Sequence, residues 1–570
     1  MLKQVIRQIS FHELFKRIIG HPWGVILIVG TVTFLFALQI PQHSFQTSIY
    51  DLIIEDLPET AVHHQFKQIF GSDEIIRVVI KAENIFEPIT FRKIESLSQH
   101  ATKIRGVRRV ISLPEIKKAV DISGKWPIEK FAGIVTPIDL FRKNIVSSDN
   151  KTTVLTLLLS NEADTESVIR AVNGLIAQTK DLSLYQIGMP LVSQALVQLT
   201  ERDFFRLPPI TILIIAIILL LLFRNFHGLF MPLVCVICTL VWTFGLMTWS
   251  RIPLSMLTLI VPVFLVAVGT AYCLYIMSEY IRCSQHGTSP AEVVVRTYSG
   301  ISFPTVLAVV TTVIGLGSLL VNRIPTIREF AIFSCFGMFS LLVIVLTLLP
   351  AMMCVAPLPR KRHYDKSKNH DWLGRMINGI IHLDLNRQMV ILPVLGGLVV
   401  FCILGIFRIK VETNPLGYFK KDDPVYRNFH DIYHDLSGSF PINLVMAGNE
   451  KDYFENPDHI KEILRIQGFL EKVPGVDKTV SFADYLKLVN YTTNRFDPKY
   501  YALPEEGWEL RMVMNNYKAV LGEDMFTRFM TSDLSSTNIL LLTHLSSSRQ
   551  FLETREKIID HVQKAFPRSL

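Results

Sequence analysis

An internal repeat limits the folds open to this chain: a bilayer-length apolar segment and the soluble sequence behind it occur twice. The first apolar segment covers residues 27–40 and the second covers residues 392–406. Behind each segment the same residues stand at the same spacing: Thr47, Asp56 and Pro58 in the first copy, Thr413, Asp422 and Pro424 in the second. Transporters use repeats of this kind, because two similar halves can rearrange around a central pathway. The duplication therefore favours transport.

Composition agrees with a membrane protein that has large soluble parts, since 49% of the residues are apolar and 19% are charged. The net charge of +8 lies largely beside apolar segments, so it indicates contact with anionic lipid rather than nucleic acid. All seven cysteines fall in or at the ends of apolar segments, and no disulfide framework is expected. Cys235 and Cys238 lie in one apolar helix without a second ligand pair, so helix packing explains them better than a metal site does.

Apolar runs of about 20 residues cross a bilayer as helices, and the sequence predicts seven of them. They cover residues 22–40, 207–223, 228–249, 253–281, 300–321, 329–355 and 389–407. Ser289 and Glu292 form a capping box around Pro290, which predicts a short helix leading into the fifth span.

Basic residues in the short loops set the expected orientation. One side of the membrane receives Lys3, Arg7, Lys16, Arg17, Arg224, Arg282, Arg296 and the run from Arg360 to Lys368. Only Arg251 and Arg323 fall on the other side. We therefore expect an inner (plasma) membrane protein with a cytoplasmic N-terminus and both soluble domains outside the cytoplasm. Residues 11–19 have helical spacing and predict a helix in the cytoplasmic interface.

Each soluble domain alternates strand and helix patterns, the βαβ rhythm of ferredoxin-like units. The first copy has strands at 75–81, 107–113 and 153–159 and helices at 90–103 and 165–179. The second has strands at 442–447, 476–482 and 539–545 and helices at 457–472 and 547–565. In the first copy the second span is preceded by a further strand, by the turn Gly188-Met189-Pro190 and by a polar helix. The second copy has no counterpart of these, so we expect an open sheet edge there.

The expected fold is an α+β membrane protein with seven transmembrane helices and two extracytoplasmic ferredoxin-like (βαβ) domains in tandem repeat. Its parts are an interfacial helix (1–21), the first span (22–40), soluble domain 1 (41–206), a block of five spans (207–355), a basic linker (356–388), the seventh span (389–407) and an incomplete soluble domain 2 (408–570).

The chain resembles the first two-thirds of an exporter of the resistance-nodulation-division (RND) superfamily, in its MMPL-like predicted exporter branch. The most specific residues join the fifth and sixth spans: Gly315, Gly317, Ser318, Ile324, Pro325, Arg328, Phe330, Gly337, Leu348, Leu349, Pro350 and Ala351. The turn at Gly188 and Pro190 is a second family-like feature. The resemblance implies twelve spans, two porter domains and export of hydrophobic or amphipathic molecules, often lipids, driven by the proton gradient.

The sequence departs from the family in the fourth span, where many relatives carry a proton-relay aspartate and this chain has Ala271. A buried carboxylate can load and release a proton as its surroundings change, but alanine cannot. Three explanations are open: the relay lies in the missing half of the transporter, another polar residue of this chain substitutes for the aspartate, or transport does not use protons in the familiar way. The proposed substitutes are Tyr272, Thr311 and Thr312. Packing and hydrogen bonds to the threonines' own helix are the structural alternatives for them.

An enzymatic function is not expected, because the chain has neither a phosphate-binding Gly-rich loop nor a nucleophile elbow. No catalytic residue, metal site or cofactor is predicted. The expected partners are membrane lipids, a hydrophobic small-molecule or lipid substrate, and a complementing C-terminal half or a second copy of the chain. Without a complementing half we expect an unstable product.

Three other functions stay open on the sequence. The five-span block also resembles that of sterol-sensing, Patched-like receptors, which do not transport. An accessory subunit of protein translocation belongs to the same superfamily. An inactive truncated fragment is the third alternative.

Overall fold

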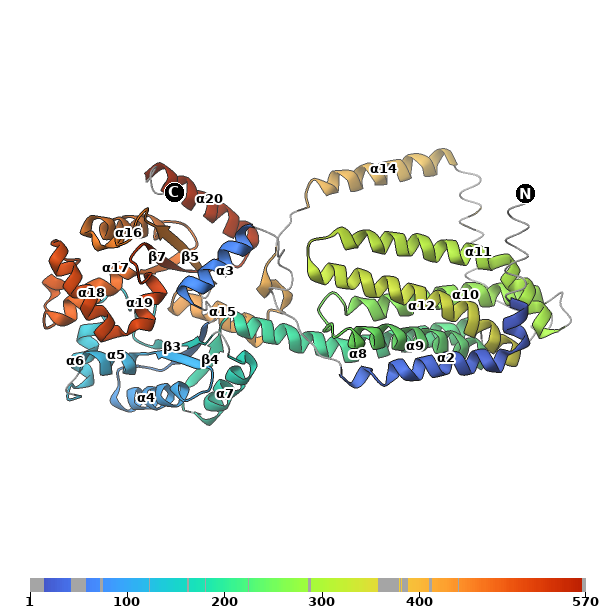
Figure 1. Cartoon of the computed structure of the whole chain (residues 1–570), viewed down its shortest axis with the longest axis horizontal. Helices are drawn as coiled ribbons and strands as arrows, with labels where there is room; N and C mark the ends of the chain where they lie inside the picture. Colours follow the sequence, from blue (N-terminus) through green and yellow to red (C-terminus); the bar gives the residue numbers. More distant parts are fainter. Residues whose placement is uncertain are drawn as a thin grey trace. The chain divides into compact units, whose positions relative to one another are not determined.

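The computed structural model describes residues 15–42, 58–71, 75–121, 124–160, 163–179, 181–223, 225–284, 289–356, 388–409, 413–438 and 440–565, together with Gly379 and Ile381. They form two compact units (Figure 1). The first unit comes from residues 1–52 and 197–411, and the second from residues 53–196 and 412–570. Most of the predicted interfacial helix and basic linker, and Thr47 and Asp56 of the repeat, lie outside the described residues.

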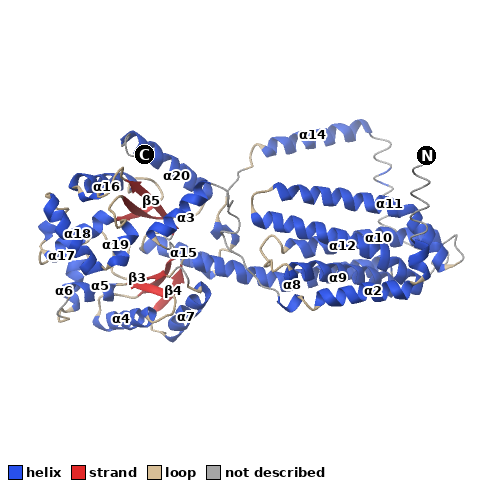
Figure 2. Cartoon of the chain, viewed as in Figure 1, coloured by secondary structure: helices blue, strands red, loops and turns tan. Residues whose placement is uncertain are grey.

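The first unit consists of long apolar helices (Figure 2). They are α2 (Pro22–Ala37), the part of α8 (Met189–Phe223) from residue 197 on, α9 (Phe226–Trp249), α10 (Ile260–Ser284), α11 (Pro290–Gly317), α12 (Pro325–Val355) and α14 (Gln388–Ile406). Five of them, α8 to α12, are long and apolar enough to cross a bilayer. The apolar stretches of α2 and α14 are shorter. The protein is thus a mixed helix and strand protein of membrane type.

The predicted start of the fourth span at residue 253 is wrong, because α10 begins at Ile260. Ser255 and Thr258 fold the preceding residues into a turn. The hydroxyl of Thr258 accepts a hydrogen bond from the backbone nitrogen of Ser255 at 2.8 Å and donates one to the carbonyl of Ser255 at 3.0 Å. Such local bonds compete with helix formation.

The helix predicted at Pro290 is confirmed, and it runs without a break into the fifth span as α11. The Ser289 hydroxyl accepts a hydrogen bond from the backbone nitrogen of Glu292 at 3.3 Å, which caps the helix. The expected separate interfacial helix and span are therefore one element.

Small residues let the helices of the first unit approach closely. A Cβ atom at Gly245 of α9 would lie 2.6 Å from the Cβ of Phe36 and 2.8 Å from its backbone oxygen. A Cβ atom at Gly337 of α12 would lie 2.5 Å from Leu265 of α10. The buried Tyr298 hydroxyl donates to the carbonyl of Val345 at 3.0 Å and ties α11 to α12. These contacts fix the helices around one apolar core.

The second unit contains two lobes, which we define as the first lobe (residues 58–196) and the second lobe (residues 413–565). The first lobe has a four-stranded antiparallel sheet in the order β2-β3-β1-β4. Its strands are β1 (Ile75–Lys81), β2 (Val107–Ile111), β3 (Thr152–Leu159) and β4 (Ser183–Ile187). Helix α4 (Pro88–Thr102) joins β1 to β2, and α7 (Thr165–Gln178) joins β3 to β4. The predicted strands and helices of this copy are confirmed, except that the second strand ends at Ile111 and not at residue 113, because a helix begins at Leu113.

The second lobe repeats this sheet with one strand fewer, in the order β5-β7-β6. Its strands are β5 (Phe440–Ala447), β6 (Val476–Ser481) and β7 (Ser536–Thr543). Helix α16 (Pro457–Leu470) joins β5 to β6, and α20 (Ser548–Ala565) follows β7. In the described part of this lobe, no strand takes the place beside β5 that β4 takes beside β1. Val445 of β5 is 43% exposed, as expected for an open edge.

Helices that the sequence pattern did not predict fill the connections from β2 to β3 and from β6 to β7. They are α5 (Leu113–Val120) and α6 (Ile128–Val135) in the first lobe, and α17 (Phe482–Thr493), α18 (Gly507–Leu521) and α19 (Glu523–Phe529) in the second. The Ser481 and Asp484 capping box starts α17. A single apolar core runs through both lobes, from Ile76 and Leu157 to Phe482 and Tyr517.

Candidate binding site between the two lobes

The two lobes exchange the helices that precede their sheets. Helix α3 (Pro58–Phe70) and helix α15 (Pro424–Asp435) begin at the equivalent prolines of the repeat. Helix α15 of the second lobe packs against β4 of the first, and α3 of the first lobe packs against α19 of the second. Arg555 of α20 lies 3.8 Å from Glu59 of α3. The lobes therefore hold each other through reciprocal contacts.

A charged cluster fixes α15 to the first lobe. The Lys81 ammonium lies 2.7 Å from Asp431 and 2.8 Å from Asp435. Tyr185 donates to Asp431 at 2.7 Å, and Thr152 donates to Asp435 at 2.9 Å. Burial alone would raise the pKa of Asp431, but hydrogen bonds from Lys81 and Tyr185 lower it below its ordinary value. The Asp431 carboxylate is thus charged near neutral pH.

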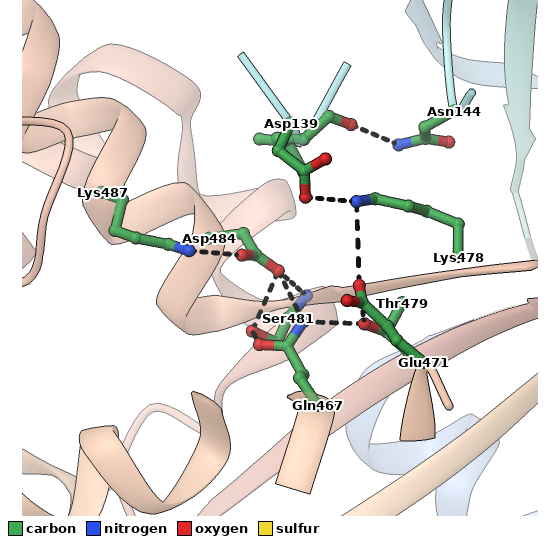
Figure 3. Close-up of polar contacts among 10 residues, drawn as sticks. Asp139, Asn144, Gln467, Glu471, Lys478, Thr479, Ser481, Asp484 and Lys487 are labelled. Atoms are coloured by element: carbon green, nitrogen blue, oxygen red, sulfur yellow. Dashed lines mark hydrogen bonds and ion pairs between the residues drawn. The ribbon is translucent and has the colours of Figure 1, made fainter. Parts of the chain in front are cut away.

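A second polar contact joins the lobes at Lys478 of β6 (Figure 3). Its ammonium lies 2.5 Å from Asp139 of the first lobe and 3.7 Å from Glu471. The Lys478 side chain is only 9% exposed, whereas Asp139 is 70% exposed. Thr479 donates to Glu471 at 3.0 Å and orients this carboxylate. The contact therefore places a buried cation of one lobe against a solvated acid of the other.

Arg77 of β1 is buried beside the interface. Its Nη2 atom donates to the carbonyl of Asn144 at 2.6 Å, and the neighbouring Lys143 carbonyl accepts from the backbone nitrogen of Ser437 at 2.7 Å. Burial lowers the pKa of Arg77 to about 10. The Nη1 atom has no hydrogen-bond partner among the described residues. Arg77 thereby positions the segment that the second lobe binds.

An apolar cavity of about 430 Å³ lies between the helices that fill the two connections. Its walls come from β2 and α5 of the first lobe and from α17, α18 and α19 of the second. Val110, Ile116, Leu488, Val489 and Met525 are among its lining residues. Sites for small ligands have volumes of about 300–1,000 Å³ and mostly apolar walls. We call this space the apolar cavity.

A second space of about 470 Å³ adjoins the apolar cavity and is mostly polar. Its walls come from α3, from the ends of β2 and β3, and from α19. His64, Lys67, Asp524 and Arg528 are among its lining residues. We call this space the polar cavity. Arg108 and Arg109 line both cavities and therefore mark the boundary between them.

The proposed relay residues lie in two helices of the first unit. Tyr272 is in α10, and Thr311 and Thr312 are in α11. Thr311 and Thr312 both donate to the carbonyl of Ala308, at 2.9 and 2.8 Å. Among the described residues no hydrogen bond joins Tyr272 to either threonine. Ala271, at the family's aspartate position, is exposed on α10. Glu279 pairs with Arg282 at 2.5 Å. The three relay residues stay a prediction.

Sequence reasoning missed the residues that line the cavities. Arg109 and Leu521 are far apart in the chain, yet the Arg109 guanidinium donates to the Leu521 carbonyl at 2.6 Å. The amphipathic pattern of α5 and α17 was a signal for these helices, but most of their residues were predicted as neither helix nor strand.

Apolar helices of bilayer length and a pair of repeated α+β lobes define a membrane protein of the transporter class. The model of the MMPL family matches residues 59–377, which is more than half of the chain. The chain belongs to the MMPL family. This result confirms the resemblance found in the sequence.

Three curated proteins show what the chain is similar to. A membrane protein of Methanocaldococcus jannaschii is 23% identical over 62% of this chain and 95% of its own length. The membrane protein YdgH of Bacillus subtilis is 22% identical over 82% of this chain and 51% of its own length. The apo-petrobactin exporter of Bacillus anthracis is 22% identical over 77% of this chain and 63% of its own length. The chain thus spans about half to two thirds of the two Bacillus proteins.

Proposed function

We propose that the protein exports hydrophobic or amphipathic molecules, including lipids, through the space between its two lobes. The observation that carries the proposal is the apolar cavity, which both lobes line. An apolar substrate that enters from the membrane avoids full hydration on this route. The family, and the exporter of Bacillus anthracis among its similar proteins, support a transporter of the RND and MMPL type.

We further propose that both lobes are ferredoxin-like porter domains and that α2 and α14 complete a set of seven spans. The strand order β4-β1-β3-β2, with helices crossing from β1 to β2 and from β3 to β4, supports this assignment for the first lobe. The second lobe has the equivalent order without the fourth strand. Helix α14 has 19 residues, close to the length that a bilayer requires.

From the positive-inside rule we propose that both lobes lie outside the cytoplasm of an inner membrane protein, with the N-terminus inside. Ser167 in the first lobe and Ser532 in the second are exposed. We expect Ser167→Cys and Ser532→Cys to react with a membrane-impermeant maleimide in intact spheroplasts, in a chain whose own cysteines are replaced by alanine. Labelling of either position only after lysis would place that lobe in the cytosol and end the proposal.

Filling the apolar cavity is expected to stop export. Ala119 lines the cavity and is exposed, so Ala119→Trp occupies the space without entering the core. We expect cells that produce this variant to lose efflux of a fluorescent single-chain amphiphile at least about tenfold, because the substrate and the indole compete for one volume. The matched control is Ala171→Trp on α7, which is exposed and lies outside the cavity lining.

Equal efflux by Ala119→Trp and wild type would exclude the apolar cavity as the route. The same assay tests the energy source, since a protonophore should abolish efflux that is driven by the proton gradient. It also tests the proposed relay through Tyr272→Phe, Thr311→Val and Thr312→Val. Unchanged efflux in all three variants would remove these residues from the proposed relay.

The proposed partners are membrane lipids and a complementing half or a second copy of the chain. The open edge of β5 supports a partner strand, because unpaired backbone groups at an edge favour pairing. Co-purification of two differently tagged copies would show self-association. Monodisperse, transport-active single chains would contradict the need for a partner.

A further inference from the structure

We infer that the site between the lobes binds an amphiphile with one anionic head group, whose tail occupies the apolar cavity and whose head lies at Arg108 and Arg109. The inference rests on the proposed function and specifies its substrate class. The head group is a carboxylate or phosphate that is attached to an apolar chain.

The position of the two arginines supports this assignment. Arg108 and Arg109 are adjacent residues of β2 and line both cavities, so an anion bound to them is connected directly to the apolar volume. The Arg109 guanidinium is held against the second lobe by its 2.6 Å bond to the Leu521 carbonyl. A Cβ atom at the adjacent Gly522 would lie 3.3 Å from Arg109 Nη1, so glycine leaves room for the guanidinium. A fixed guanidinium loses little freedom when it binds an anion.

The charges of the polar cavity also favour an anion. Its lining contains the cationic side chains Lys67, Arg108, Arg109 and Arg528, and Asp524 is the one carboxylate among the described lining residues. An excess of one sign in a concave space attracts ligands of the opposite sign.

The pair between Arg108 and Asp524 provides a partner that the ligand can replace. Both side chains are partly exposed, at 51% and 42%, and they belong to different lobes. A carboxylate or phosphate head can take the place of Asp524, because it offers Arg108 the same charge-assisted hydrogen bonds. Binding then exchanges one ion pair for another.

Apart from Arg108 and Arg109, the charged residues that line the apolar cavity balance each other. Lys118 lies 3.0 Å from Glu115, so this pair adds no net charge to the lining. The remaining lining is dominated by side chains such as Ile116, Leu488 and Met525. A free inorganic anion would leave this volume unused, whereas an attached alkyl chain fills it.

The test uses the full chain in phosphatidylcholine nanodiscs and two photoactivatable probes, a diazirine fatty acid and its methyl ester. We expect the acid to crosslink to residues 485–492 and 520–525, and the ester to crosslink there at least about tenfold less. Excess dodecyl phosphate should compete with the acid, and inorganic phosphate should not.

Arginine variants assign the head-group site. Arg108→Gln and Arg109→Gln should each lower crosslinking of the acid at least about tenfold, and Arg109→Lys should lower it less, because the charge stays. Asp524→Asn should increase crosslinking, since Arg108 loses its competing partner. Arg105→Gln is the matched control, because Arg105 is exposed near the start of β2 and lines neither cavity.

Two failures are distinguishable. Equal crosslinking of acid and ester, unchanged by Arg108→Gln and Arg109→Gln but blocked by Ala119→Trp, would overturn the anionic head group and leave the proposed export route intact. Absence of crosslinks from both probes at the lobes would overturn the proposed route as well. Arg108→Gln keeps the test valid if Arg109→Gln disturbs the fold, because Arg108 is an exposed side chain.

Discussion

Gly188→Ala is expected to lower the free energy of unfolding of the first lobe by at least about 3 kcal/mol. Gly188 links β4 to α8 and has φ +147°, a backbone conformation that side chains disfavour. A Cβ atom there would lie 2.5 Å from the backbone oxygen of Ile75, the first residue of β1. The backbone of β1 cannot yield without losing its register with β3 and β4, so both strain and collision remain.

Gly174→Ala is the matched control for this prediction. Gly174 lies inside α7 of the same lobe, and a Cβ atom there would meet nothing within 4 Å. Alanine favours the helix over glycine, so this variant should be more stable than wild type by about 0.5–1 kcal/mol. Thermal unfolding of the solubilised chain and limited proteolysis of the first lobe measure both variants. Equal stability of Gly188→Ala and wild type would refute the close approach of this turn to β1.

Much of the fold could be predicted from local patterns in the sequence. Apolar length alone predicted the helices α8 to α12, and the strand and helix rhythm predicted the sheets of both lobes. The start of α10 was wrong because hydrophobicity does not report the hydrogen bonds of Ser255 and Thr258. These hydrogen bonds hold the backbone before Ile260 in a turn, so the helix begins later than the apolar pattern predicts.

The site between the lobes could not be predicted in the same way. Its residues come from β2, α5, α17, α18 and α19. The contacts that bring these elements together join residues hundreds of positions apart, as in Arg109 of β2 with Leu521 of α18. Periodicity reports which face of a helix is apolar, but it does not report which other helix covers that face. The exchange of α3 and α15 between lobes follows from the packing of the whole unit and leaves no local signal.

Lys81→Met is expected to lower the free energy of unfolding of the second unit by about 1–2 kcal/mol at pH 7, a value reduced because the cluster is partly exposed. The variant leaves Asp431 and Asp435 side by side, without the ammonium that lies within 2.8 Å of both. Lys93→Met is the matched control. Lys93 pairs at 2.8 Å with Asp181, which is 73% exposed, and this variant should leave stability unchanged.

The pH dependence of Lys81→Met separates lost charge pairing from lost packing. In the wild type the lowered pKa of Asp431 gives stability that is present above the ordinary value of 3.8 and is lost as pH falls through the folded-state pKa. Between pH 5 and 7 Asp431 therefore adds no pH dependence to the free energy of unfolding of the wild type. In the variant, burial and repulsion from the neighbouring Asp435 raise the pKa of Asp431, so the folded state takes up a proton and stability rises as pH falls from 7 to 5. Thermal unfolding at the two pH values measures this difference. A variant that is equally destabilised at both would show that Lys81 acts through packing of its chain, and that the charges of Asp431 and Asp435 do not hold the lobes together.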